Sequence, residues 1–300
     1  MMELAGPAAL ALDSLSSREV AFLQQIPKAE LHAHLNGSIP LSTLKELASE
    51  YLALLTTSTS ESTSPVISSQ AIQHGIEALT RGPSLDKIED FFVLFPAIYA
   101  ITSTPDALER ATRAVLSAFL DGDKPQCTYL ELRTTPRQTD AMDRELYVRT
   151  VLSAMNHYGP DKVGLIVSID RRMGDDVLRE CLGIARKLKA EGELVVGLDL
   201  CGDPTAGNMS EFAPYFSQAK DVGLGITLHI AEVSSKNLLC RQLRKFLTFK
   251  TVHNTPEETL ELLSYNPDRL GHATFLNEEA ISIVLEKKMC IEICLTSNLL

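Results

Sequence analysis

Positive charge is in short supply in this 300-residue sequence: 28 basic residues stand against 39 acidic ones, for a net charge of -11. A chain with this overall field repels phosphate backbones and anionic lipid headgroups. We therefore expect no nucleic-acid partner and no membrane partner. A phosphorylated small molecule would need local arginines to overcome the same field.

Paired cysteines and long apolar runs are also missing. None of the six cysteines forms a C-x-x-C pair, and Cys290 and Cys294 lie in an apolar stretch, as buried thiols do. This usage predicts reduced thiols inside a cell. No apolar run reaches the roughly 18 residues that span a bilayer. Glu3 stands where a signal peptide would carry positive charge, so we expect a cytoplasmic protein.

Short apolar runs alternate with amphipathic stretches along the chain. The apolar runs predict strands at 28–35, 128–133, 162–170, 194–201, 225–232, 269–274 and 290–297. Helical patterns occupy 105–120, 143–155, 175–190, 210–221 and 278–288, and Thr255-Pro256 marks another helix start. This alternation predicts parallel strands with right-handed crossovers. Seven such units favour a TIM-type (β/α)8 barrel with seven of its eight strands present, rather than an open sheet.

Two segments interrupt this rhythm. Residues 56–69 are rich in Ser and Thr and predict a mobile surface loop. Residues 234–253 contain five basic residues and no acidic one, which fits an exposed insertion, a basic docking surface or unspliced sequence. We divide the chain into an N-terminal extension, 1–25, and a single barrel domain, 26–300.

The first predicted strand contains His32-Ala33-His34. Residues i and i+2 of a strand point to the same face, so the two imidazoles lie side by side. Such a pair is half of a zinc site, because zinc needs three or four convergent ligands. Two ordinary strand histidines would give the same pattern.

Polar residues also stand at the ends of the other predicted strands. They are Asp170-Arg171-Arg172, Gly202-Asp203, His229 with Glu232, Gly271-His272 and Thr296-Ser297-Asn298. Each alone has a structural explanation, such as a surface ion pair, a turn or a hydrogen-bonded core histidine. Together they matter more, because the strand ends of a parallel barrel converge on one mouth.

These residues can be assigned chemical roles. His32, His34 and His229 are candidate zinc ligands, with a carboxylate suited to the fourth position. Glu232 and His272 are the candidate proton donor and acceptor. Glu232 stands three residues after His229, so the chain must turn after Ile230 for this role. The implied chemistry is hydrolytic attack on an sp² carbon.

Three motifs, 31–38, 228–232 and 269–272, resemble the adenosine/AMP deaminase family of zinc hydrolases. Residues 130–137, 169–172 and 198–204 are similar to the adenosine deaminase-like branch, which acts on N6-methyl-AMP. Asn36 occupies a position where adenosine deaminases carry Asp. The resemblance covers residues 26 to 298 apart from the two interrupting segments.

The resemblance implies a monomeric hydrolase with one zinc ion, which converts N6-methyl-AMP, AMP or adenosine to IMP or inosine plus an amine. It implies that Glu232 protonates the purine ring nitrogen and that His272 orients or deprotonates the attacking water. The implied substrate contacts are His34, Asn36, Tyr99, Asp170 and Gly202, with a phosphate-facing loop of Thr134, Thr135, Pro136 and Arg137. The small-molecule partner is thus a purine nucleotide.

The sequence departs from this family at three places. Tyr99 replaces a His near the end of a helix over 86–100, and it cannot carry a positive charge. Ala273 replaces the Gly after the catalytic His. The family's last zinc ligand belongs to an Asp-Asp pair on an eighth strand, whereas no Asp follows Asp268 here. We therefore expect a truncated barrel with weak zinc binding.

Two other interpretations remain open. A different amidohydrolase could use the same scaffold on cyclic amides or esters, although no Lys ends a middle strand to bridge two metals. Alternatively, the chain is a catalytically impaired relic that binds nucleotide. Metal content would separate these interpretations.

Overall fold

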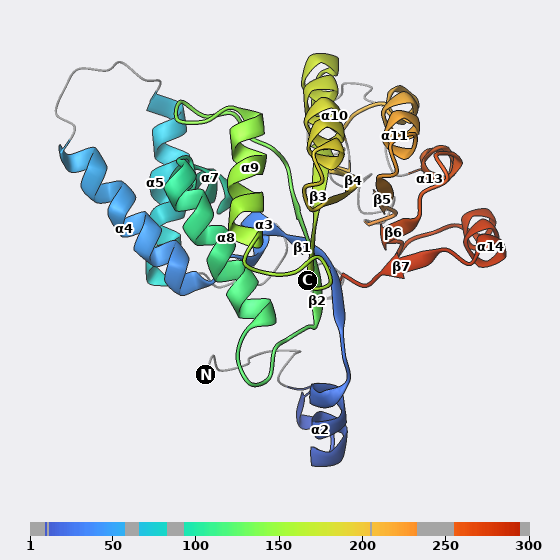
Figure 1. The fold of residues 1–300 in the computed structure, drawn as a ribbon, viewed down its shortest axis with the longest axis horizontal. Helices are drawn as coiled ribbons and strands as arrows, with labels where there is room; N and C mark the ends of the chain where they lie inside the picture. The colour runs from blue at the N-terminus through green and yellow to red at the C-terminus, as the bar shows by residue number, and fades with distance from the viewer. Residues whose placement is uncertain are drawn as a thin grey trace, which may run out of the picture.

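A single sheet of seven parallel strands, paired in chain order, organises the structure (Figure 1). The structure is a computed structural model, which describes residues 10, 12–57, 66–82, 93–204, 206–232 and 255–294. The strands are β1 (Ala29–His34), β2 (Tyr129–Thr134), β3 (Val163–Asp170), β4 (Val195–Cys201), β5 (Gly225–Ile230), β6 (Arg269–His272) and β7 (Cys290–Glu292). All seven predicted strands are confirmed, and β6 and β7 are shorter than predicted.

Helices connect these strands and cover the sheet. They are α2 (Ser17–Gln25), α3 (Leu35–Ser38), α4 (Leu41–Thr57), α5 (Val66–Arg81), α7 (Phe95–Ile101), α8 (Pro105–Leu120), α9 (Arg144–Met155), α10 (Asp175–Ala190), the short η1 (Met209–Glu211), α11 (Ala213–Lys220), α13 (Pro256–Ser264) and α14 (Glu278–Lys287). Figure 1 shows α4, α5, α7, α8 and α9 on one side, α10, α11, α13 and α14 on the other, and α2 beyond the start of β1.

Local sequence explains the helix bounds. The predicted helix over 175–190 is confirmed residue for residue, and 210–221 divides into η1 and α11. Thr255 caps α13, because its side chain accepts a hydrogen bond from the backbone N–H of Glu258. The predicted loop over 56–69 is wrong at both edges, since α4 continues to Thr57 and α5 begins at Val66.

The sheet curves into a nearly closed barrel. Within the described residues, β1 pairs with β2 and β7 pairs with β6, and the two edge strands share no backbone ladder. Side chains bridge them instead, because Nδ1 of His32 on β1 lies 2.7 Å from Oε2 of Glu292 on β7. The TIM-type barrel fold with seven strands is therefore confirmed.

The apolar core lies between the sheet and its helices. On β2, Leu130 and Leu132 are fully buried, and strand alternation directs them to the face opposite Glu131 and Arg133. Those two polar side chains point into the barrel, where they meet residues of distant strands. The interior of this barrel is thus polar, whereas side chains of branched apolar residues fill most TIM barrels.

Several predictions concern residues beyond this description. The basic segment 234–253 and Thr296-Ser297-Asn298 lie outside the described residues, as do 86–92 of the expected helix over 86–100. Cys294 is buried as predicted, but Cys290 is exposed because it begins the edge strand β7. No helix within the described ranges is long and apolar enough to cross a membrane.

Candidate active site

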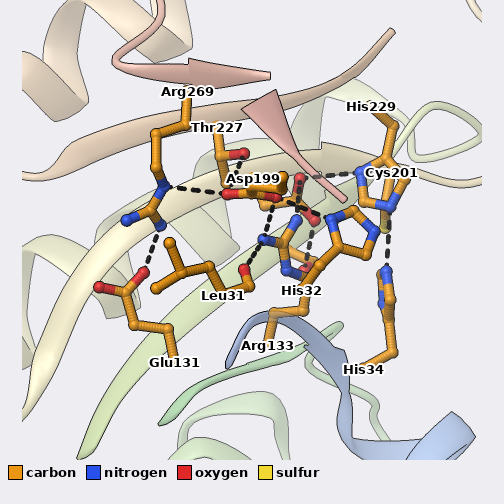
Figure 2. Close-up of polar contacts among 12 residues, drawn as sticks. Leu31, His32, His34, Glu131, Arg133, Asp199, Cys201, Thr227, His229 and Arg269 are labelled. Carbon is orange, nitrogen blue, oxygen red and sulfur yellow. Dashed lines mark hydrogen bonds and ion pairs between the residues drawn. The ribbon is translucent and has the colours of Figure 1, made fainter. Parts of the chain in front are cut away.

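Three predicted ligands, His32, His34 and His229, meet at the ends of β1 and β5 (Figure 2). Their ring centroids are 4.6 to 5.2 Å apart, and Nε2 of His34 lies 2.9 Å from Nε2 of His229. Two imidazole nitrogens this close need a proton or a cation between them. Burial is the main reason that the pKa values of His34 and His229 lie well below 6.5. The rings are therefore neutral, as metal ligation requires.

Two carboxylates brace these rings from behind. Nδ1 of His32 lies 2.7 Å from Oε2 of Glu292, and Nδ1 of His229 lies 3.0 Å from Oδ1 of Asp199. A His that binds a metal usually donates its second ring N–H to such a partner, which fixes the tautomer. The arrangement therefore leaves Nε2 of both rings as the ligand atom.

Glu292 is held as an anion inside the barrel. It accepts hydrogen bonds from Arg133 at 2.6 Å, Thr227 at 2.9 Å and Arg269 at 2.9 Å, in addition to His32. Burial alone would raise the pKa of Glu292, but the hydrogen bond with His32 and the charge of Arg133 outweigh it and lower the pKa to about 2. The carboxylate is therefore ionised throughout the physiological range.

Arg133 joins the two bracing carboxylates. Its guanidinium is 0% exposed and lies 3.3 Å from Oδ1 of Asp199 and 2.6 Å from Oε2 of Glu292. It also donates to the carbonyl of Leu31. One buried cation thus contacts the supports of His32 and His229 together.

The charges continue across the barrel as an alternating series. Arg269 pairs with Glu292 on one side and Glu131 on the other, and Tyr129 donates to Glu131 at 2.9 Å. We call Glu131, Arg269, Glu292, Arg133 and Asp199 the interior charge chain. This chain was not predicted from the sequence. Glu131 and Arg133, at positions i and i+2 of an otherwise apolar strand, did indicate that charged side chains share one face of β2.

Glu232 and His272 come together beside the histidines. Ala231 has φ 50°, so the chain leaves β5 in a left-handed turn directly after Ile230, as predicted. The turn brings Oε1 of Glu232 within 3.6 Å of Nε2 of His272, whose ring centroid is 4.9 Å from that of His32. A carboxyl group and an imidazole at this distance from the ligands can exchange protons with a molecule bound at the centre.

The end of β6 is strained. His272 has φ 63° and Ala273 has φ 50°, both in the left-handed region that favours glycine. The N–H of Ala273 donates to the carbonyl of Ile230 at 3.0 Å, which links this turn to the end of β5. The absence of Gly at 273 therefore costs about 1–2 kcal/mol of backbone strain.

Asn36 carries an unused acceptor. It lies in α3, directly after β1, and its side chain is buried. Its Oδ1 has no hydrogen-bond partner among the residues that the structure describes. A buried amide oxygen left in this way favours a ligand with a donor group.

Asp170 and Gly202 meet at the ends of β3 and β4. The Asp170 carboxylate accepts three hydrogen bonds from Arg172, at 2.6 to 2.8 Å, which is the ion-pair corner considered above. Gly202 has φ 103°, and a Cβ there would lie 2.5 Å from Oδ1 of Asp170. Only glycine allows this approach. Arg171 is buried instead and pairs with Glu258 at 2.5 Å.

Residues 134 to 137 span the last residue of β2 and the loop after it, and they do not all face outward. The Thr134 hydroxyl is buried and lies 2.7 Å from that of Tyr147, while Pro136 is buried. Thr135 Oγ1 lies 3.6 Å from Sγ of Cys201. The side chains of Thr134 and Pro136 therefore shape this loop.

Arg137 keeps its positive charge unneutralised. Its described hydrogen-bond partners are the carbonyls of Tyr99 and Thr102 and the Thr102 hydroxyl, and Nε is buried without a partner among the described residues. The guanidinium lies 4.6 Å above the Tyr99 ring. A guanidinium held by neutral groups is suited to an anion.

Tyr99 is a neutral neighbour of that cation. Burial raises its pKa to about 12, although the charge of Arg137 opposes the shift. The side chain thus keeps its hydroxyl proton at physiological pH and, as expected, carries no positive charge.

Known proteins match this chain over most of its length. The family model described as "Adenosine deaminase" matches residues 27–300. N6-Methyl-AMP deaminase-L of Xenopus laevis is 34% identical over 287 residues, which cover 93% of this chain and 71% of that protein. N6-Methyl-AMP deaminase of Homo sapiens is 32% identical over 291 residues, covering 92% and 71%.

A solved structure matches the fold as well. Arabidopsis ADAL complexed with IMP has a TM-score of 0.69 and 31% identity, and the match covers 92% of this chain and 73% of that chain. The family resemblance seen in the motifs is thereby confirmed. This chain belongs to the adenosine deaminase family of metal-dependent hydrolases.

Proposed function

We propose that this protein is a zinc-dependent deaminase of 6-substituted purine monophosphates, which hydrolyses N6-methyl-AMP to IMP and methylamine. One observation carries the proposal: three convergent histidines, two of them braced by carboxylates, a Glu232–His272 pair, and an Arg137 without a carboxylate partner among the described residues come from the strand ends and following segments of one barrel. The relatives named N6-methyl-AMP deaminase, and the relative that holds IMP, support the choice of substrate.

The donor set fits zinc. His32, His34 and His229 would hold the ion through Nε2, because carboxylates accept from Nδ1 of two of them and Nε2 of the third faces His229. When bound, zinc supplies a hydroxide nucleophile near neutral pH. The candidate ligand atoms already lie within 4.8 Å of one another.

Glu232 and His272 would manage the protons. Water adds to C6 of the purine, the bond between C6 and the exocyclic nitrogen breaks, and the amine leaves. Glu232 would donate a proton to the ring nitrogen beside C6, and His272 would take a proton from the attacking water or orient it. Their 3.6 Å separation permits the two groups to act on adjacent atoms of the substrate.

The remaining residues would bind the nucleotide. Arg137 would hold the phosphate, with the loop of Thr134, Thr135 and Pro136 setting its position. Asn36 would receive a donor group of the substrate at Oδ1, which has no partner among the described residues, alongside His34, Tyr99, Asp170 and Gly202. The positive charge of Arg137 attracts the phosphate locally, against the repulsion that the net charge of -11 produces.

The test combines metal analysis with product identification. The purified chain is incubated with N6-methyl-AMP, AMP and adenosine, and IMP, inosine and amine are quantified beside the zinc content. We expect bound zinc and preferential turnover of N6-methyl-AMP. A chain that binds nucleotide without zinc or turnover would instead be the impaired relic, and turnover of cyclic amides alone would indicate a different amidohydrolase.

A further inference from the structure

We propose that Arg133 is a positioning residue: it holds Asp199 and Glu292 so that His32 and His229 both carry their proton on Nδ1 and present Nε2 to the metal. The inference rests on the metal site of the proposed function. Arg133 lies on β2 and contacts the supports of the ligands rather than the ligand atoms themselves.

The first argument is the set of groups around Glu292. Its Oε2 accepts hydrogen bonds from His32 Nδ1 and Arg133, and its Oε1 accepts from the Thr227 hydroxyl and Arg269 Nε. Because a carboxylate anion only accepts, Nδ1 of His32 must donate. The tautomer of His32 is thus determined by a carboxylate whose oxygens are held in place by two guanidiniums.

Asp199 has the same kind of surroundings. Its Oδ1 receives His229 Nδ1 at 3.0 Å and Arg133 at 3.3 Å, and its Oδ2 receives the Ser168 hydroxyl at 2.8 Å. Asp199 is 0% exposed, so no water competes for it. His229 must therefore also donate from Nδ1.

Arg133 alone contacts both supports among the described residues. Arg269 contacts the other oxygen of Glu292, Oε1, and its second carboxylate partner is Glu131 rather than Asp199. Without Arg133, Asp199 and Glu292 would be two buried negative charges close together without their shared cation, which is an unfavourable state. The two carboxylates would then hold the imidazoles of His32 and His229 less firmly in one orientation.

The backbone of β1 supports the same role. The pairing of β1 with β2 is irregular between Glu30 and Ala33, so Leu31 and His32 leave the regular ladder. Arg133 donates to the carbonyl of Leu31 at this irregularity, and Glu30 accepts from the N–H of His32 at 2.8 Å. Arg133 thus holds both the backbone next to His32 and the group behind its ring.

The experiment compares Arg133→Lys with the matched control Arg269→Lys. A lysine keeps the charge, but all its N–H donors are on one atom, and it lacks the planar fork with which Arg133 reaches both carboxylates and the carbonyl of Leu31. Zinc affinity is measured by chelator competition, and the cobalt(II) absorption spectrum reports the geometry of the ligands. We expect Arg133→Lys to weaken zinc binding about 10–100-fold and to change the spectrum. Arg269→Lys should change both much less.

A second pair of variants separates orientation from charge. In Asp199→Asn the amide can face Ser168, whose hydroxyl can accept, so His229 keeps its partner oxygen. In Glu292→Gln the amide must face Arg133 or Arg269, which only donate. We therefore expect Glu292→Gln to lose more zinc affinity than Asp199→Asn, although both remove one charge. Equal losses would overturn the proposal.

The unsubstituted protein provides a test that needs neither variant folding nor metal. Nitrogen-15 NMR of the metal-free chain distinguishes Nδ1–H from Nε2–H, and we expect Nδ1–H for His32 and His229. An Nε2–H tautomer at either residue overturns the proposal, as does unchanged zinc affinity in a folded Arg133→Lys. A chain with the expected tautomers that binds no metal would refute the proposed function and leave the positioning geometry intact.

Discussion

The two halves of the candidate site are held in different ways. The metal half, His32, His34 and His229, stands on strands, and buried carboxylates brace two of its rings. The nucleotide half comes from strand ends and the segments after them, and Asn36 and Arg137 there have hydrogen-bonding atoms without a partner among the described residues. The comparison indicates that the metal half is preorganised by the fold, whereas the nucleotide half completes its hydrogen bonds only when a ligand binds.

The most severe way to break the metal half is His229→Ala. Removing this ligand leaves two imidazoles, too few to retain zinc. We expect zinc content and turnover to fall to background, measured by elemental analysis and product formation. The control is His157→Ala, an exposed histidine that contacts Arg113. Retention of stoichiometric zinc by His229→Ala would show that the ion is held elsewhere.

Glu232→Gln should separate proton transfer from metal binding. Glutamine has nearly the same shape but cannot deliver a proton, so turnover should fall about 10²–10⁴-fold with zinc retained. Glu211→Gln, at an exposed position in η1, serves as the control. A near-normal rate in Glu232→Gln would mean that another group is the proton donor.

Arg137→Ala tests the nucleotide half. Loss of a charge-assisted contact should cost roughly 1.5–3 kcal/mol in transition-state binding of the monophosphate. Turnover of the nucleoside and zinc content should hardly change. The control is Arg179→Ala, whose exposed side chain pairs with Asp175. If kcat/KM fell equally for monophosphate and nucleoside, Arg137 would have no phosphate role.

The metal half should also respond to pH. Burial is the main cause that lowers the pKa of His34 and His229 well below 6.5. Below pH 6.5 these histidines take up protons in the unfolded chain but stay neutral in the metal-free native state. Their contribution to the free energy of unfolding is therefore fully present above pH 6.5 and is lost as the pH falls. Each group contributes up to about 1.4 kcal/mol per pH unit.

Denaturant unfolding of the chelator-treated protein between neutral and mildly acidic pH measures this effect. Zinc should reduce the loss, because bound metal keeps the rings deprotonated. A free energy of unfolding independent of pH in this range would show that the rings are not buried in their neutral form.

The smallest expected effect comes from Ala273→Gly. Glycine at this position removes the strain of about 1–2 kcal/mol that alanine has at a left-handed φ of 50°. It also makes the unfolded chain more flexible, which lowers the stability by about 0.5–1 kcal/mol. We therefore expect a gain of about 0.5–1 kcal/mol in stability without loss of zinc. Ala280→Gly, in the helix α14, should have the opposite sign. A destabilised Ala273→Gly would contradict the strain at this turn.

Local patterns were enough to predict much of the architecture. The period of apolar residues located every strand, and Thr255 located the start of α13. Where local patterns compete with long-range contacts, the predictions were less accurate. The C-terminal end of α4 and the N-terminal end of α5 extend into the Ser/Thr-rich segment, because helix propensity is only a weak determinant of where a helix begins or ends.

The sequence by itself determined that His32 and His34 share a face and that polar residues end the strands, and it required a turn after Ile230 for Glu232 to act beside His229. These facts follow from spacing of a few residues. Only the tertiary structure decided that Glu292, which is 260 residues from His32, supports that ring, and that one arginine joins Glu292 to Asp199. The physical reason is that a strand pattern specifies which face a side chain takes, whereas barrel closure selects which buried charges meet.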